Sequence, residues 1–347
     1  MTTIVTIITA IILFGVIVLT HELGHFLTAN WVGIPAEEFS IGMGPKIYQR
    51  KGKKTAFSLR ALPIGGYVKF IDEDEKSDNP RAFGNASVWK RILVIISGPI
   101  MNFLLAILLL AIFFMSFGTY QISTNILEIV DGGPAQEAGL QEGDKIIEIN
   151  GVKADQGNEE KGIEQFRHVI SQDGSNPLQI TIERKGEIES FAVQPNYSEE
   201  RDVYEIGIVF GQLERHGILS AIGLGFVQTG RLIVMMVQLL GGLIFKGQGL
   251  SEVVGPIGIV GEIGRAVQSG LQDVMNLAIV ITLNLGIINL VPFPALDGGR
   301  LALLLVEAVR GKPMDQTKEG YIHVIGFILL MLLMIVVTFK DVVRQWM

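Results

Sequence analysis

The feature that most constrains this chain is a His-Glu-Leu-Gly-His motif at residues 21–25, which directly follows the apolar run Ile4–Thr20. On a helix, His21 and His25 lie one turn apart on the same face. This spacing suits two ligands of one zinc ion, with Glu22 beside the metal as a general base. Two histidines and a glutamate at the end of a membrane-length segment are costly in lipid, so we expect an intramembrane site. The alternative is an interfacial helix end with solvated histidines.

A second stretch, Asn-Leu-Val-Pro-Phe-Pro-Ala-Leu-Asp-Gly-Gly at residues 289–299, complements the first. Two prolines within a helix at membrane depth free backbone groups, which is tolerated where protein or a cavity satisfies them. Asp297, just beyond these prolines, is costly in a membrane unless it is paired or bound to a metal. His21, His25 and Asp297 would make a three-ligand zinc site that leaves the fourth position to water. An ordinary polar helix end is the alternative.

The composition indicates a membrane protein. The chain has 347 residues, 49% of them hydrophobic, and a mean hydropathy of +0.43. Because it has no cysteine, disulfides, cysteine-zinc sites and thiol catalysis are excluded. The net charge of −7 argues against nucleic acid as a partner. No basic region precedes the first apolar run and no cleavage site of small residues follows it, so we expect a retained helix rather than a signal peptide.

Four apolar runs are long enough to cross a bilayer and predict a polytopic α-helical membrane protein with four transmembrane helices. The segment between the first two runs is rich in lysine and arginine, which places it in the cytoplasm. The candidate site then lies near the cytoplasmic side, whereas both termini and the acidic segment 118–217 lie on the outer side. The four runs are Ile4–Thr20, Ile92–Phe117, Val274–Phe293 and Ile322–Phe339.

The segment Ile218–Phe245 is apolar enough for a fifth span, although Gln228, Arg231 and Gln238 interrupt it. If it crossed the membrane, Asp297 would lie on the side opposite to the histidine pair. We therefore predict an interfacial or re-entrant helix. The predicted regions are thus 1–117, 118–212, 213–272 and 273–347.

Residues 38–70 have the pattern of strands. Phe39, Ile41 and Met43 alternate before a Gly-Pro pair, and Arg-Lys-Gly-Lys at residues 50–53 is typical of a hairpin turn. We expect a membrane-associated β-hairpin or sheet that folds against the motif helix and pairs with an unwound substrate by strand addition. An ordinary cytoplasmic hairpin is the alternative.

Two polar features between these elements are predicted to be structural. Asn102, in the second apolar run, is expected to hold a neighbouring helix through a hydrogen bond of modest strength. The acidic loop Asp72–Asn79 is expected to be solvated.

The region 118–212 is predicted to be an inserted α+β domain. Its run PAQEAGLQEGDKIIEINGV, at residues 134–152, resembles the bacterial, circularly permuted PDZ domain. The resemblance implies a groove that binds a peptide or protein by strand addition, and a steric filter is the alternative. Beside a strand that ends at Asn-Gly 150–151, the expected elements are strands at 125–130, 178–183 and 190–194 and helices at 134–140 and 163–170.

Together these stretches closely resemble the site-2 protease family of intramembrane zinc metalloproteases, and most nearly its bacterial branch, with a PDZ domain, that resembles the regulator of sigma-E protease. The matching stretches, in family order, are HELGH, the hairpin from GMGP to GGYVKF, SGPIMNF, the PDZ stretch, GPIGI and NLVPFPALDGG. The chain departs from the family pattern in having one PDZ domain where well-known members carry two.

The resemblance implies that Glu22 is the catalytic base and that Asn289 and Pro292 lie near the substrate. It also implies a location in the bacterial plasma (inner) membrane. The implied cofactor is Zn²⁺, bound by His21, His25 and Asp297.

The predicted function is cleavage of the transmembrane segments of single-pass membrane proteins, in contact with membrane lipid. The resemblance implies anti-sigma factors or remnant signal peptides as substrates. A proteolytically inactive, membrane-anchored PDZ scaffold is the alternative, and Glu22 argues against it because a structural zinc site needs no base. A metal transporter is disfavoured by the lack of an internal repeat.

Overall fold

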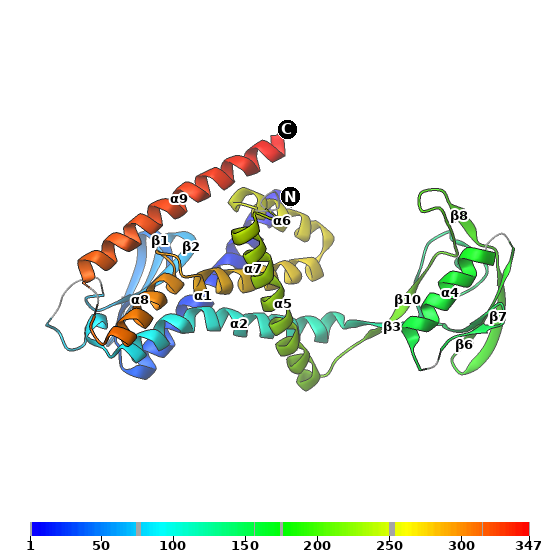
Figure 1. Ribbon diagram of the computed structural model, residues 1–347, viewed down its shortest axis with the longest axis horizontal. Coiled ribbons are helices and arrows are strands. Elements are labelled where there is room, and N and C mark those ends of the chain that lie inside the picture. The colour runs from blue at the N-terminus through cyan, green and yellow to red at the C-terminus, as the bar shows by residue number, and fades with distance from the viewer. Residues whose placement is uncertain are drawn as a thin grey trace. The chain divides into compact units, whose positions relative to one another are not determined.

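The computed structural model describes residues 2–73, 78–155, 157–173, 176–249, 254–313 and 315–346. The chain divides into two compact units (Figure 1). The first unit comprises Met1–Phe113 and Ile218–Met347, and the second comprises Phe114–Gly217. The first unit therefore carries both ends of the chain, and the second is an insertion in it.

Helices dominate the first unit. Among the described residues, α1, α2, α5, α7 and α9 are long and apolar enough to cross a membrane, by length and composition. Three of the predicted spans lie within α1, α2 and α9, and the fourth, Val274–Phe293, extends three residues beyond the end of α7 at Leu290. The bounds are α1 Thr2–Val32, α2 Val88–Phe117, α5 Ile218–Lys246, α6 Pro256–Ser269, α7 Leu271–Leu290, α8 Asp297–Arg310 and α9 Gln316–Trp346, with a 3₁₀ turn at Phe83–Asn85.

Helix α5 contains the segment predicted to be interfacial or re-entrant. It is unbroken over 29 residues and meets the length and apolarity of a span. Figure 1 shows α5 running across the direction of α2 and α7 rather than along it. The start of α7 at Leu271 lines a groove with Thr9 of α1, while the loop after α7 brings Asp297 to His21, so α1 and α7 run in the same direction. The interfacial position of α5 stays a prediction.

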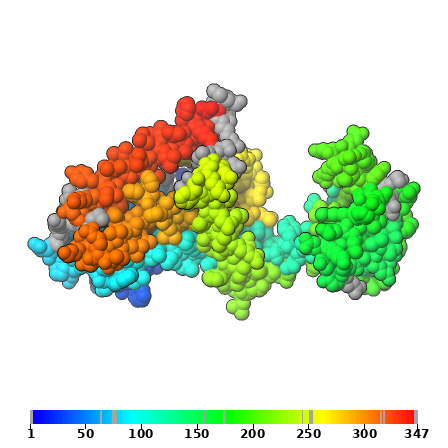
Figure 2. All heavy atoms as spheres, in the orientation of Figure 1, coloured from blue at the N-terminus to red at the C-terminus, as the bar shows by residue number. Residues whose placement is uncertain are grey.

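Helix α9 exposes most of its apolar side chains. Only 6% of its most apolar window is buried, and Figure 2 shows the helix, in red, as a ridge on the surface. Near its end, the buried Asp341 carboxylate accepts hydrogen bonds from the backbone N–H groups of Gly255 at 3.1 Å and Gly258 at 2.9 Å. A carboxylate at a helix N-terminus satisfies free N–H groups and the helix dipole, so Asp341 fixes the start of α6 to α9.

The hairpin is formed by β1 (Ala36–Lys51) and β2 (Ala56–Phe70), which pair antiparallel. Each long strand is bent on itself. Residues 38–41 have Cα partners in both 66–69 and 56–59, and residues 48–51 have partners in 56–59 as well. Gly42 and Gly65 lie at the bends with φ of +83° and +82°, a conformation that favours glycine. The sheet packs on α1, as predicted.

A charged network inside the sheet holds these bent segments together. The side chain of Glu38 is 11% exposed and lies 3.0 Å from the Arg60 guanidinium and 3.4 Å from the Lys46 ammonium. Burial raises the pKa of the Glu38 carboxyl, but hydrogen bonds from Ser58, Arg60 and Lys46 outweigh it and lower this pKa to about 2. The Arg60 guanidinium also donates hydrogen bonds to the Ser40 hydroxyl, the Gly44 carbonyl and the Tyr67 hydroxyl.

Glu38→Gln should lower the free energy of unfolding by about 1–3 kcal/mol near neutral pH, because it leaves buried donors without their charged acceptor. The folded-state pKa lies below the ordinary value of 4.5, so the stabilisation is present above about pH 4.5 and is lost as the pH falls through about 2. Thermal unfolding in detergent, followed against pH, measures this difference. Glu37→Gln is the control, since the Glu37 side chain is 54% exposed. A difference between Glu38→Gln and wild type that does not change with pH would contradict the network.

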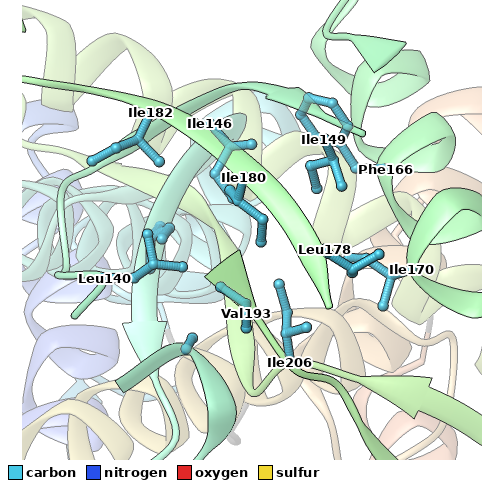
Figure 3. Packing of buried hydrophobic residues seen from close by; sticks show 12 residues of the cluster. Leu140, Ile146, Ile149, Phe166, Ile170, Leu178, Ile180, Ile182, Val193 and Ile206 are labelled. Atoms are coloured by element: carbon cyan, nitrogen blue, oxygen red, sulfur yellow. The ribbon is translucent and has the colours of Figure 1, made fainter. Parts of the chain in front are cut away.

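The second unit is built on one sheet with strand order β10-β3-β4-β6-β7, with β5 paired to β4. Helix α4 packs against this sheet, and the core contains Phe166, Ile149 and Ile180 at 0% exposure (Figure 3). Gly139, with φ of +90°, follows the short helix α3. The bounds are β3 Thr119–Ile129, α3 Pro134–Glu137, β4 Lys145–Ile149, β5 Val152–Lys153, α4 Glu159–Asp173, β6 Leu178–Arg184, β7 Glu187–Val193, β8 Asn196–Ser198, β9 Val203–Glu205 and β10 Ile208–Glu214.

Because the second unit has its own core, we expect residues 114–217 to fold cooperatively when expressed alone. Phe166→Ala should lower the free energy of unfolding of this fragment by about 3–5 kcal/mol, measured by denaturant titration. Ile188→Ala removes a side chain that is 71% exposed, and it should change that free energy by less than about 0.5 kcal/mol. Equal effects of the two substitutions would contradict the assigned core.

Candidate metal centre

Side chains from two distant parts of the sequence meet in the first unit. His21 and His25 of α1 are 6% and 7% exposed. Their Nε2 atoms lie 3.3 Å apart, and Asp297 Oδ2 lies 3.0 Å from the first and 3.3 Å from the second. Within the described residues, this trio is the group of histidine and carboxylate side chains whose atoms are close enough to share a metal ion.

The geometry of the trio fits a tetrahedral metal. Ligand bonds of about 2.0–2.2 Å at tetrahedral angles place neighbouring ligand atoms roughly 3.3–3.6 Å apart. The three observed separations, 3.0–3.3 Å, are close to this range. Asp297 Oδ2 is buried without a hydrogen-bond partner in the described structure, although both imidazoles are near. The three atoms therefore converge on a common point, and if they bound a zinc ion they would leave its fourth position open.

The loop before Asp297 positions its carboxylate beside the two imidazoles. Helix α7 ends at Leu290, and Val291 is extended, with φ −62° and ψ 133°. The expectation that both prolines lie within the helix is thus wrong, because a residue that precedes proline avoids the helical conformation. Asp297 opens α8, and a side chain at Gly299 would come within 2.8 Å of the Phe293 backbone. The Gly-Gly pair therefore lets α8 begin directly against the loop.

Helix α9 also contacts the loop between α7 and α8. Ala295 has φ of +76°, and its N–H donates a hydrogen bond to Nδ1 of His323 at 3.1 Å. A side chain at Gly326 would come within 2.6 Å of the Pro294 carbonyl oxygen. These contacts hold a strained turn in place just before Asp297.

One face of α2 orients the two imidazoles. His25 Nδ1 lies 2.8 Å from the Val94 carbonyl oxygen, which accepts its hydrogen bond. The Asn102 amide lies 3.3 Å from His21 Nδ1. Between them, a side chain at Gly98 would come within 2.9 Å of the His21 ring. The expectation that Asn102 hydrogen-bonds to a neighbouring helix is confirmed, because its partner His21 belongs to α1, but its position beside a candidate metal ligand was not expected. The Thr282 hydroxyl of α7 does bond to the Asn102 backbone carbonyl at 3.3 Å, but the side chain faces a candidate ligand.

Glu22 lies at the edge of the sheet. Its carboxylate is partly buried and accepts a hydrogen bond from the backbone N–H of Val68. A side chain at Gly66 would come within 2.8 Å of the Ser40 carbonyl oxygen and 3.4 Å of the Glu22 Cγ atom, so glycine lets β2 pack against β1 at this point beside Glu22. The base candidate and the last segment of β2 are thus neighbours.

Two ion pairs, which sequence reasoning missed, hold α8. Arg91 of α2 pairs with Glu307, and their side chains are 10% and 14% exposed. Arg300 pairs with Glu73, whose side chain is 12% exposed. The expectation of a solvated loop at 72–79 is therefore wrong at Glu73, while residues 74–77 of that loop lie outside the described residues. The partners are 216 and 227 residues apart, so no local pattern could have revealed them.

The two residues expected near the substrate lie in the segment of chain just before Asp297. Asn289 is partly buried in the last turn of α7, and Pro292 is exposed in the loop that follows. Their contact with a substrate stays a prediction.

Comparison with known proteins places the chain in a family. Residues 9–333 match the model of peptidase family M50. A protein of Clostridium acetobutylicum is 38% identical, with 97% of each chain covered. The zinc metalloprotease RasP of Geobacillus kaustophilus is 32% identical, with 98% of each chain covered. The regulator of sigma-W protease RasP of Bacillus subtilis is 30% identical, with 99% of each chain covered.

Among solved structures, the PDZ domain of an SdrC-like protein from Listeria innocua is similar to part of the chain. It is 20% identical, with 27% of this chain and 99% of that chain covered and a TM-score of 0.22.

The family match and the full-length relatives agree with the convergence of His21, His25 and Asp297. The chain belongs to peptidase family M50, the site-2 proteases, and is a zinc metalloprotease with Zn²⁺ as its cofactor.

Proposed function

We propose that this zinc metalloprotease cleaves the transmembrane segments of single-pass membrane proteins. The observation that carries the proposal is the convergence of His21 Nε2, His25 Nε2 and Asp297 Oδ2 in a chain whose described residues include five helices of membrane length. In this proposal the three residues hold the zinc ion, and Glu22 is the catalytic base.

The chain's own residues then have distinct tasks. Bound zinc supplies Lewis-acid chemistry that polarises a carbonyl and activates water. Glu22 takes a proton from the attacking water and returns it to the departing amine. Contacts with α2 orient the imidazoles, the Arg91–Glu307 pair ties α8 to α2, and His323 of α9 bonds to the turn before Asp297, so the three groups stay fixed. In this proposal Asn289, in the last turn of α7, and Pro292, in the loop that follows, contact the substrate close to Asp297 in the chain.

In this proposal the substrate binds along the edge of the sheet formed by β1 and β2. A helical segment hides its peptide carbonyls in its own hydrogen bonds, so cleavage requires local unwinding. Residues 66–69 pair with 38–41 and pass Glu22, and an extended substrate could add as a further strand beside the base.

The proposed topology has four spans, α1, α2, α7 and α9, with α5 in the membrane interface. The parallel course of α1 and α7 supports it, because one added span between α2 and α7 would separate Asp297 from the histidines. The 14 residues of α6 cover about 21 Å, less than the ~30 Å of a bilayer core. The catalytic site then lies near the cytoplasmic side of the bacterial inner membrane, with the termini and the second unit outside.

We infer that the second unit is a PDZ domain that screens substrates before they reach the site. The α+β architecture and the run at residues 134–152 support this assignment. Because one relative is named for regulation of sigma-W, membrane-bound anti-sigma factors are the first substrate class to test, with remnant signal peptides second.

Glu22→Gln should lower cleavage of a tagged single-pass substrate by at least about 10²-fold, because the amide cannot take the proton from water. The variant should keep one zinc per chain, since Glu22 is not a proposed ligand. Product is measured by gel assay of enzyme and substrate reconstituted in vesicles, with chelator-treated wild type as a second control. Equal product in wild type, Glu22→Gln and chelated samples would contradict the proposal and favour a binding scaffold.

Asp297→Ala should reduce zinc content to well below one per chain, because removal of one of three protein ligands destroys the site. Asp273→Ala is the matched control, since Asp273 is exposed at the start of α7. Atomic emission of the purified full-length variants measures the metal. Retention of full zinc content by Asp297→Ala would rule out its role as a ligand.

A further inference from the structure

The side chain of Asn102 is buried next to His21, one of the proposed zinc ligands. It is fully buried on α2, eight residues after Val94, so both lie on the helix face that meets the two imidazoles. The Asn102 amide lies 3.3 Å from His21 Nδ1, while the amide oxygen Oδ1 is buried without a hydrogen-bond partner in the described structure.

His25, the other proposed histidine ligand, shows which hydrogen bond to expect for His21. His25 Nδ1 lies 2.8 Å from the Val94 carbonyl, which can only accept, so this nitrogen carries the proton. His25 Nε2 then has a free lone pair directed to the point shared with Asp297. Histidine ligands of metals ordinarily donate the hydrogen of the other ring nitrogen in this way.

His21 needs the same arrangement if its Nε2 is to bind the metal, because a neutral imidazole carries one proton. The proton must then be on Nδ1, which faces Asn102. If the amide NH₂ of Asn102 faced this protonated nitrogen, two N–H donors would point at each other and neither would have an acceptor. A half-turn of the nearly symmetric amide brings Oδ1 to Nδ1 instead, which gives the proton an acceptor and the buried oxygen a partner.

We propose that Asn102 is a positioning residue for His21: its Oδ1 accepts the Nδ1–H hydrogen bond and thereby keeps Nε2 of His21 available as a zinc ligand. This inference rests on the proposed ligand role of His21. Asn102 thereby does for His21 what the Val94 carbonyl does for His25, so that α2 fixes the tautomer and ring orientation of both histidines.

Asn102→Leu and Asn102→Asp separate this role from packing. Leucine has nearly the same volume but no acceptor, whereas aspartate keeps an oxygen at the same place. The proposal predicts that zinc leaves Asn102→Leu about 10- to 100-fold faster than wild type. It predicts that Asn102→Asp retains zinc within about threefold of wild type or more tightly, since carboxylates serve as histidine partners in metal sites. A residue that only packs would give the reverse order, with leucine tolerated and a buried carboxylate harmful.

The experiment uses the full-length chain in detergent, loaded with one zinc, and follows metal release to a chromogenic chelator. Thr282→Val is the matched control, because it removes a buried hydroxyl that bonds to the Asn102 backbone carbonyl but leaves the side chain in place. This control should release zinc at the wild-type rate. Thermal unfolding of the metal-free variants shows whether each is folded, and an unfolded Asn102→Leu is replaced by Asn102→Ala, for which the same loss is expected.

His21→Ala distinguishes failure of this inference from failure of the proposed function. If His21→Ala keeps zinc like wild type, the ligand set itself is wrong. If His21→Ala loses zinc while Asn102→Leu releases it at the wild-type rate, or Asn102→Asp releases it as fast as Asn102→Leu, the ligand set stands and the role of Asn102 is overturned.

Discussion

The structure of the first unit depends on the burial of two imidazoles and a carboxylate at one point among apolar helices. Such groups are costly away from water unless a shared partner satisfies them. Asp297 Oδ2 has no hydrogen-bond partner in the described structure, although the two Nε2 atoms lie within 3.3 Å. A zinc ion bound there would resolve this conflict, because it would accept one lone pair from each group. The arrangement of the surrounding elements follows from the need to hold these three atoms.

Each candidate ligand is held by an element remote in sequence. The α2 face bonds to both imidazoles and has a glycine, Gly98, where the rings approach. The Arg91–Glu307 pair fixes α8, which begins with Asp297, and His323 of α9 holds the turn just before it. Hydrogen-bond partners of this kind orient metal ligands, and here they come from α2, α8 and α9.

The sequence predicted the elements that have a local signature. The motif at residues 21–25 specified the spacing of two ligands, and the alternation after Phe39 predicted strands that the structure contains. The two prolines were recognised but assigned to the interior of a helix, whereas they terminate it. The ion pairs of Arg91 and Arg300 and the contact between Asn102 and His21 depend on tertiary packing, which no spacing along the chain encodes. The bent register of β1 with β2 was missed for the same reason.

The most direct test of the central claim is X-ray absorption at the zinc edge of the purified full-length protein. The account predicts a first shell of nitrogen and oxygen at about 2.0–2.2 Å, with two imidazoles and a carboxylate. Because the chain has five histidines, a shell of three or more imidazoles is chemically available. That result, or a single imidazole, would contradict the claim that His21, His25 and Asp297 are the protein ligands of the catalytic zinc.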